Sequence, residues 1–230
     1  MRDKDWPFVS FDTPAAMMDF IRANTQLMAP PLVPEIKLYL AEESLPIWHK
    51  TEEELGEINV PPPFWAFAWA GGQALARYIL DNAALLRGKT VLDLGSGSGL
   101  TAIAAMLTGA TTALASDIDT LSLAAIAANA EANGVSVATT AENLLAAPPR
   151  DADVILVGDL FYERALAESV SAYIAQAALG GALVLIGDPQ RSYFPKGKFA
   201  MAAEYSVPVT RELEDSEIKR TAVWRLGPGS

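Results

Sequence analysis

Residues 91–99, VLDLGSGSG, have the types and spacing of a ligand-binding turn. An apolar run ends in an acid and a loop of alternating glycines, and residues 100–107 then continue in a helical pattern. Glycine lets the backbone approach a ligand where a Cβ would clash, and the first turn of a helix offers N–H groups that lack intrahelical partners. The segment therefore predicts a strand, a turn and a helix start that suit a nucleotide-like ligand.

The spacing of the glycines indicates which ligand this is. Gly95, Gly97 and Gly99 follow G-x-G-x-G, whereas the dinucleotide fingerprint G-x-G-x-x-G places its third glycine three residues after the second. S-adenosylmethionine has no phosphate but carries an ammonium group and a sulfonium, and both favour a nearby carboxylate. We therefore predict that S-adenosylmethionine is the cofactor and that it contacts Asp93, Gly95, Ser96, Gly97 and Gly99. A tight strand-to-helix turn without a ligand is the alternative.

Polar residues after the next two predicted strands could complete this site. Asp117 ends a strand where a carboxylate can accept both ribose hydroxyls, so we predict a cofactor contact. Asp119, just after it, is interpreted as the N-cap of a helix over residues 121–133. Asn143 follows a short third strand and is the candidate for the adenine edge, with an ordinary Asx turn as the alternative.

These residues need a framework that brings strand ends together. The periodicity predicts helices over residues 14–27, 72–85, 100–107, 121–133 and 163–179, and strands over residues 35–41, 91–94, 112–116, about 135–140, 153–157, 182–186, about 203–210 and 220–226. Five strand-helix steps followed by a terminal hairpin are the layout of class I methyltransferases. The predicted fold is therefore α/β and Rossmann-like, a mostly parallel sheet with a terminal antiparallel hairpin. Because the prolines at 61–63 mark a boundary, we expect residues 1–60 to be an N-terminal extension or cover and residues 61–230 the methyltransferase domain.

The amino-acid composition and net charge limit the kinds of ligand and partner that we expect. The chain has 230 residues with 51% hydrophobic and 20% charged side chains, enough for one sizeable core. It has no cysteine, and its single histidine, His49, lies in a polar stretch and is expected in a loop, so no metal site is predicted. No apolar stretch is long enough to span a bilayer and no signal peptide is visible, so we expect a cytoplasmic protein without membrane contacts. The net charge of −11 argues against nucleic acid and suits a basic protein loop, although acidity for solubility alone is the alternative.

Several further blocks carry a resemblance. They are residues 63–69 (PFWAFAW), 71–75 (GGQAL), 77–78 (RY), 115–119 (ASDID), 158–163 (GDLFYE) and 186–189 (IGDP). Together with the glycine loop they resemble the electron transfer flavoprotein beta subunit lysine methyltransferases, within the seven-β-strand protein methyltransferases. Related lysine methyltransferases have an acidic-x-x-aromatic signature after the fourth strand, which residues 159–162 (DLFY) match. Ala70 departs from the family, which usually has proline there.

The resemblance implies S-adenosylmethionine-dependent methylation of lysines in a protein substrate. The implied substrates are the electron transfer flavoprotein beta subunit and ribosomal protein L7/L12, with which bacterial relatives are associated. The ribosomal protein L11 methyltransferases are similar in their first half but have Asn-x-Leu after the fourth strand. An L11-type enzyme and a small-molecule N-methyltransferase of the nicotinamide type remain alternatives. A cofactor-binding module without activity would predict a degraded acceptor motif.

Methyl transfer to an amine is an in-line displacement that needs no metal. The lysine must arrive uncharged, which at neutral pH costs roughly 4 to 5 kcal/mol. The resemblance assigns catalysis to Asp159, which would accept a hydrogen bond from the amine and orient its lone pair, and to Tyr162. The remaining predictions are Trp69 at the cofactor and Trp65, Phe161 and Glu163 at the substrate, with aromatic faces favouring the sulfonium through cation–π attraction. Core packing is the alternative for Trp65 and Phe161, and a helix start for Glu163.

Overall fold

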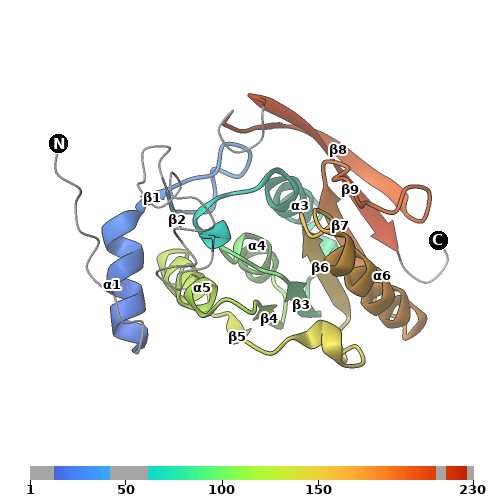
Figure 1. Ribbon diagram of the computed structural model, residues 1–230, viewed down its shortest axis with the longest axis horizontal. Helices are drawn as coiled ribbons and strands as arrows, with labels where there is room; N and C mark the ends of the chain where they lie inside the picture. Colours follow the sequence, from blue (N-terminus) through green and yellow to red (C-terminus); the bar gives the residue numbers. More distant parts are fainter. Residues whose placement is uncertain (1–12, 42–61, 211–215, 227–230) are drawn as a thin grey trace.

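A seven-stranded sheet in the order β5-β4-β3-β6-β7-β9-β8 runs through the molecule (Figure 1). The computed structural model describes residues 13–41, 62–210 and 216–226, so His49 and its predicted loop lie outside the described residues. The strands are β3 (Thr90–Leu94), β4 (Thr112–Ser116), β5 (Ala138–Thr140), β6 (Val154–Gly158), β7 (Leu183–Asp188), β8 (Ala200–Pro208) and β9 (Ile218–Leu226). The first five pair in parallel, and β9 is antiparallel to both β7 and β8. The predicted parallel sheet with a terminal antiparallel hairpin is confirmed.

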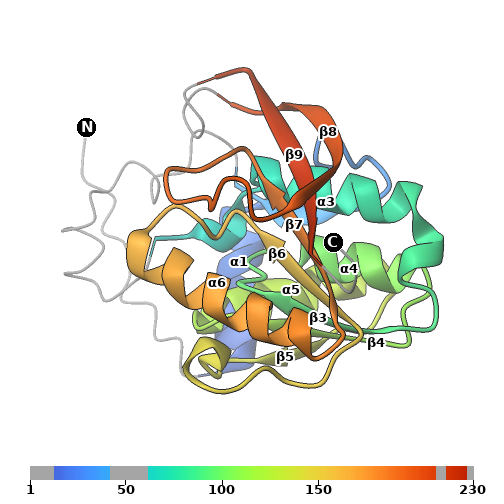
Figure 2. The ribbon, with the colours of Figure 1, turned by 90° about the vertical axis from the view of Figure 1, so that its right-hand side faces the viewer.

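Helices cover both faces of the sheet. They are α3 (Ala70–Asp81), α4 (Leu100–Leu107), α5 (Thr120–Ala132) and α6 (Arg164–Leu179), with short 3-10 turns η1 (Phe64–Ala66), η2 (Ala83–Leu85) and η3 (Leu144–Ala146). Figures 1 and 2 show the strands between α6 on one side and α4 and α5 on the other. Within β6, Val154 and Leu156 pack with α3 and α4, whereas Ile155 and Val157 pack with α6. A parallel strand buried on both faces needs this continuous apolar run, because its side chains alternate between the two layers.

The N-terminal segment packs against α5. It contains α1 (Pro14–Asn24), β1 (Gln26–Met28) and β2 (Leu38–Leu40), with β1 antiparallel to β2. Asn129 of α5 accepts the backbone N–H of Tyr39 at 2.7 Å, which fixes β2 to that helix. The prediction of one helix over residues 14–27 is wrong in its last turn, because the chain becomes extended at Thr25 and then pairs as a strand.

The architecture brings four loops to one edge of the sheet. In parallel strands the carboxyl ends lie at a common edge, and here the loops after β3, β4, β5 and β6 all line one cavity. Among the described helices, none is long and apolar enough to cross a membrane.

Candidate active site

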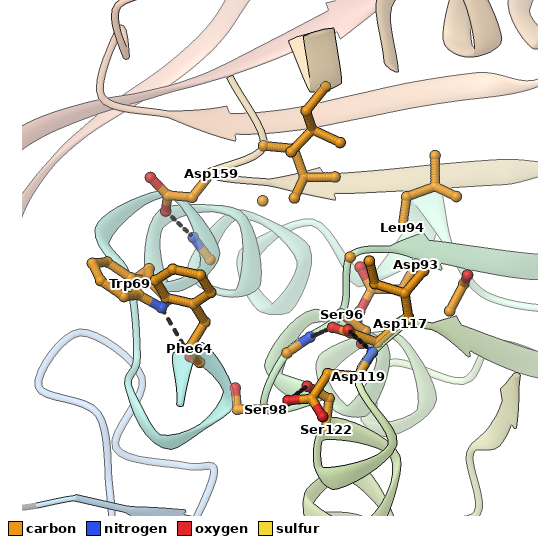
Figure 3. Close-up of a pocket in the computed structure, with 18 of the residues that line it drawn as sticks. Phe64, Trp69, Asp93, Leu94, Ser96, Ser98, Asp117, Asp119, Ser122 and Asp159 are labelled. Atoms are coloured by element: carbon orange, nitrogen blue, oxygen red, sulfur yellow. Dashed lines mark hydrogen bonds between the residues drawn. The ribbon is translucent and has the colours of Figure 1, made fainter. Parts of the chain in front are cut away.

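A cavity of about 810 Å³ lies at this edge, between the glycine loop and the segment that leads into α3 (Figure 3). Its lining includes seven of the eight side chains or glycines predicted for the cofactor, namely Trp69, Asp93, Gly95, Ser96, Gly97, Asp117 and Asn143. It also includes both residues predicted to be catalytic, Asp159 and Tyr162. One cavity therefore holds the residues of both predicted half-sites.

The glycine loop has a backbone that only glycine adopts without strain. Gly95, Gly97 and Gly99 have φ values of 58°, 54° and 82°. A Cβ at Gly95 would lie 2.6 Å from a methyl carbon of Leu160, so a side chain at this position would have to displace that leucine. Gly99 does not line the cavity: a Cβ there would meet Ile126 of α5 at 3.2 Å. The absence of a side chain at Gly99 therefore lets α4 begin close to α5, and its predicted cofactor contact remains a prediction.

Asp93 is a buried carboxylate behind this loop. Only 1% of its surface is exposed, and the Ser96 hydroxyl donates a hydrogen bond to Oδ2. Burial raises the pKa of Asp93 to about 6, although hydrogen bonds from Ser96 and Thr101 act in the opposite direction. A carboxylate whose charged form is disfavoured by burial gains from a cationic group nearby. The glycine cradle and this acid therefore fit S-adenosylmethionine, whose ammonium and sulfonium are both cationic.

Asp117, at the end of β4, both shapes the loop and faces the cavity. Its carboxylate accepts the backbone N–H of Gly97 at 2.8 Å and that of Asp119 at 3.0 Å. Burial is the main cause that raises the pKa of Asp117. Asp119 accepts the N–H of Leu121 at 2.9 Å, which confirms the predicted N-cap of α5, and it also lines the cavity. Asn143 lies on the cavity wall at the start of η3, where its adenine contact remains a prediction.

Asp159 stands at the carboxyl end of β6 and is tied to two other segments. Its φ of 57° is unusual for a residue with a side chain. Oδ2 accepts the backbone N–H groups of Gly71 and Gly72 at the start of α3, the latter at 3.2 Å (Figure 3). Oδ1 accepts Nε of Arg191 at 2.8 Å and lies 2.7 Å from Nη2. The acid is only 8% exposed, so this network holds a charged group in a largely dry position.

Arg191 is a residue that the sequence interpretation missed. It follows β7, its backbone N–H donates to Asp188 at 2.7 Å, and its guanidinium lies 5.9 Å from the Trp69 ring centroid. Asp188 is fully buried, and burial followed by the negative charge of Asp159 raises its pKa to about 7. No short motif marks Arg191, because its partners come from β6 and from the start of α3.

Aromatic side chains form the outer wall of the cavity. Trp69 donates its Nε1–H to the carbonyl of Phe64 at 2.9 Å, and the two rings meet edge to face with centroids 6.0 Å apart. Tyr162 is 48% exposed with its ring centroid 6.1 Å from that of Phe64. Phe64 was also missed, although it lies in the aromatic block that contains Trp69. The rim is thus partly open to solvent and lined by ring faces.

The three residues predicted to contact the substrate do not line the cavity. Trp65 is 2% exposed and packs with Phe20 and Ile21 of α1, and Phe161 is fully buried with its ring 5.3 Å from that of Phe194. Both side chains pack in the core and neither lines the cavity, which agrees with the core-packing alternative, and their substrate contact remains a prediction. Glu163 is exposed at the start of α6 and does not line the cavity, and its contact remains a prediction.

The sheet order, the glycine loop and the acids at the strand ends define a class I methyltransferase. Two solved structures share this fold. The protein 1320 of Thermoplasma acidophilum has a TM-score of 0.53 at 18% identity, covering 69% of this chain and 90% of its own. The magnesium protoporphyrin IX methyltransferase of Synechocystis, with bound S-adenosylmethionine, has a TM-score of 0.50 at 18% identity, covering 69% of this chain and 80% of its own.

Sequence relatives place the chain more narrowly. The family model described as ribosomal protein L11 methyltransferase matches residues 73–180. The electron transfer flavoprotein beta subunit lysine methyltransferase of mouse is 36% identical over 230 residues, covering 97% of this chain and 89% of the relative. The human protein of the same name is 36% identical and covers 91% of this chain and 81% of the relative. The chain therefore belongs to the electron transfer flavoprotein beta subunit lysine methyltransferase family, and it is an S-adenosylmethionine-dependent methyltransferase.

Proposed function

We propose that this protein methylates lysine side chains of the electron transfer flavoprotein beta subunit, of ribosomal protein L7/L12, or of both. The observation that carries the proposal is that Asp159 and Tyr162 line the same cavity as the glycine loop. A methyl donor held by the loop and a lysine held by the acid would therefore meet within one cavity. Holding both reactants in line supplies most of what this displacement needs.

The residues around the glycine loop would hold the cofactor, which supplies an electrophilic methyl group when bound. Asp117 would accept the ribose hydroxyls, and Asp93 would favour the cationic amino acid portion. Gly95, Ser96 and Gly97 would offer a close backbone surface. Asn143 would meet the adenine edge, and Trp69 would face the sulfonium, since an aromatic face attracts a cation.

The residues after β6 would receive the lysine. Its amine would approach Oδ1 of Asp159 beside Arg191, and the half-exposed ring of Tyr162 would flank the aliphatic stem. Glu163, exposed next to it, would contact the substrate backbone or a basic neighbour. The partly dry setting favours the uncharged amine, since burial disfavours an ammonium ion.

The charge of the protein supports a basic, macromolecular substrate. A net charge of −11 would accelerate the approach of a lysine-rich loop. The exposed rim formed by Phe64 and Tyr162 would admit a side chain that remains attached to a protein. A nicotinamide-type substrate would instead need a closed pocket. The L11-type alternative is less supported, because the Azotobacter vinelandii L11 enzyme is 35% identical over only 50% of this chain.

Mass spectrometry after incubation tests the proposal. The purified protein and S-adenosylmethionine would be mixed separately with electron transfer flavoprotein, L7/L12, L11 and nicotinamide. We expect methyl groups on lysines of one or both of the first two proteins. Methylation of L11 or nicotinamide alone, or no added methyl on either of the first two, would refute this assignment.

A further inference from the structure

The carboxylate of Asp159 already has hydrogen-bond donors at both oxygens. Oδ2 accepts two backbone N–H groups of α3, and Oδ1 accepts Nε of Arg191 while Nη2 lies 2.7 Å away. An ionised carboxylate offers about four lone-pair sites. Four donors from Gly71, Gly72 and Arg191 therefore lie at hydrogen-bond distance before a substrate arrives, and a lysine amine would share Oδ1 with Arg191. The acid that the motif marks for the lysine is thus not a bare negative charge.

This arrangement bears on a chemical difficulty of lysine methylation. The nitrogen needs its lone pair to attack, so the ammonium must first give its proton to solvent. A bare carboxylate at hydrogen-bond distance would stabilise the ammonium and work against that loss. A guanidinium at 2.7 Å from the same carboxylate offsets the effect, because a second cation disfavours the ammonium form of a neighbouring lysine.

We propose that Arg191 is a positioning residue for methyl transfer: its guanidinium neutralises Asp159, so that the lysine meets an ion pair without net charge. The inference rests on the proposed lysine substrate. The lysine ammonium first releases a proton to solvent. The nitrogen lone pair then forms the new bond to the methyl carbon as the carbon–sulfur bond breaks and its electron pair stays on sulfur. Arg191 acts through Asp159 and need not touch the reacting atoms.

The fold holds Arg191 in this position from several sides. Its side chain is 20% exposed, and its guanidinium lies beside the ring of Trp69 as well as against Asp159. Its backbone is tied to Asp188, and the preceding residue, Gln190, has a φ of 64°, which belongs to a tight turn. A surface arginine held only by long-range attraction would not need these constraints.

Other titratable groups near the pair must be separated from the effect of Arg191. Asp188 faces it from β7 with a pKa raised by burial to about 7, so it titrates in the range where the assay is run. From the segment after β6, Tyr162 lines the same cavity, and burial, with the charges of Glu163 and Asp117, raises its pKa further from neutrality. The start of α3 meets Asp159 with two backbone N–H groups, and the ring of Trp69, just before that helix, lies beside the guanidinium of Arg191.

The dependence of kcat on pH tests the proposal, because kcat reports the pKa values of groups in the enzyme–substrate complex, where the lysine lies beside Asp159. Wild type, Arg191→Met, Arg191→Gln and Arg191→Lys would be assayed on the lysine-bearing protein that wild type methylates. In the two neutral variants we expect the alkaline rise of the profile to move up by about one pH unit or more. The rate near neutral pH would then fall about tenfold, and the deficit would narrow by about pH 9. Arg191→Lys keeps the charge, so the alkaline rise should stay near its wild-type pH, while the loss of the two-nitrogen contact with Asp159 lowers the rate by a similar factor at every pH.

Two controls separate charge from structure. Asp188→Asn keeps an oxygen that can accept the N–H of Arg191 but removes the titration, so the shift should persist when it is combined with Arg191→Gln. Calorimetry with S-adenosylmethionine and thermal unfolding would identify the variants that fold. If Arg191→Met does not fold, Arg191→Gln, which can still donate a hydrogen bond to Asp159, provides the neutral variant. A loss of equal size at every pH in the neutral variants would overturn the inference alone. Absence of lysine methylation by wild type would overturn the proposed function and the inference with it.

Discussion

The two halves of the cavity are built from contacts of very different sequence separation. In the cofactor half, Ser96 donates to Asp93 only 3 residues away and Gly97 donates to Asp117 across 20 residues. In the acceptor half, Asp159 is held by Gly71, 88 residues away, and by Arg191, 32 residues away. The first half is a local loop with glycines at positive φ, whereas the second is a junction of three segments. Substitutions should therefore separate donor binding from methyl transfer.

The largest effect is expected for Gly95→Arg in the cofactor half. The position has a φ of 58°, and a Cβ there would lie 2.6 Å from a methyl carbon of Leu160, so a long side chain would strain the backbone and would displace Leu160 or enter the cavity. We expect S-adenosylmethionine affinity to fall by more than about 100-fold, measured by titration calorimetry. Gly88→Ala is the matched control, because Gly88 also has a positive φ, 72°, but open space around it. Unchanged affinity in Gly95→Arg would show that the glycine loop is not part of the S-adenosylmethionine site.

Asp159→Ala should show the reverse pattern in the acceptor half. We expect kcat/KM for the protein substrate to fall by about 100-fold or more, while donor affinity stays within a few-fold. The variant also removes the acceptor at the start of α3 and the partner of Arg191. Asp159→Asn keeps the shape of the side chain. Compared with Asp159→Ala, it should restore the stability to thermal unfolding more than the methylation rate. Wild-type turnover in Asp159→Ala would show that Asp159 has no role at the acceptor lysine.

Asp117→Ala should weaken donor binding less than the glycine variant does. Losing charged acceptors for two ribose hydroxyls would lower affinity by about 10- to 100-fold. Asp119→Ala, its neighbour, removes the N-cap of α5 and should cost about 1 kcal/mol of the free energy of unfolding with little change in affinity. Calorimetry and thermal unfolding of the pair would reveal whether Asp117 binds ligand or only closes the loop through Gly97.

The pH dependence of donor binding sharpens the role of Asp93. Its pKa of about 6 means that the carboxylate gains a proton as the pH falls through that value, and a protonated acid attracts a cation less. Affinity should therefore rise roughly tenfold from about pH 5 to about pH 7 and then level off. Asp93→Asn should remove this rise. Calorimetry at several pH values checks it, and a flat wild-type profile would exclude a charge contact.

The smallest effect is expected from salt. An acidic enzyme and a basic substrate loop attract each other over distances that added salt screens, since the Debye length falls from about 8 Å at physiological ionic strength to about 3 Å at 1 M. We expect kcat/KM for the protein substrate to fall about threefold over this range, with donor affinity nearly constant. If added salt lowered kcat/KM and donor affinity equally, the charge effect would lie in cofactor binding and not in the approach of the substrate.

The accuracy of the sequence predictions follows the same division. The strand over residues 112–116 was predicted to the residue, because its apolar run is bounded by clear turn signals. The strand β1 was not predicted, because its three residues show no such pattern, and it forms by pairing with β2. For β8 the predicted range starts three residues late, because the register with β9 shifts between Met201 and Ala203 and interrupts the alternation. The N-terminal division at residue 61 remains a prediction.

The candidate site shows where sequence information stops. Asp159 and Tyr162 could be placed at the cavity because they follow a parallel strand. The alternatives for Trp65 and Phe161 could not be decided beforehand, since alternating aromatic residues suit a core as well as a ligand wall. Burial against α1 and against Phe194 places both side chains in the core.

The sequence by itself determined the glycine loop, the acids beside it and the order of strands and helices. These depend on local requirements: a positive φ that only glycine adopts easily, and periodicities of apolar residues that distinguish strand from helix. Only the tertiary structure decided that Arg191 pairs with Asp159, that Gly99 serves helix packing, and which aromatic rings reach the cavity. These outcomes depend on which distant segments come into contact. The local sequence around a side chain does not specify its partner, because the sheet and helices bring the two together only in the folded chain.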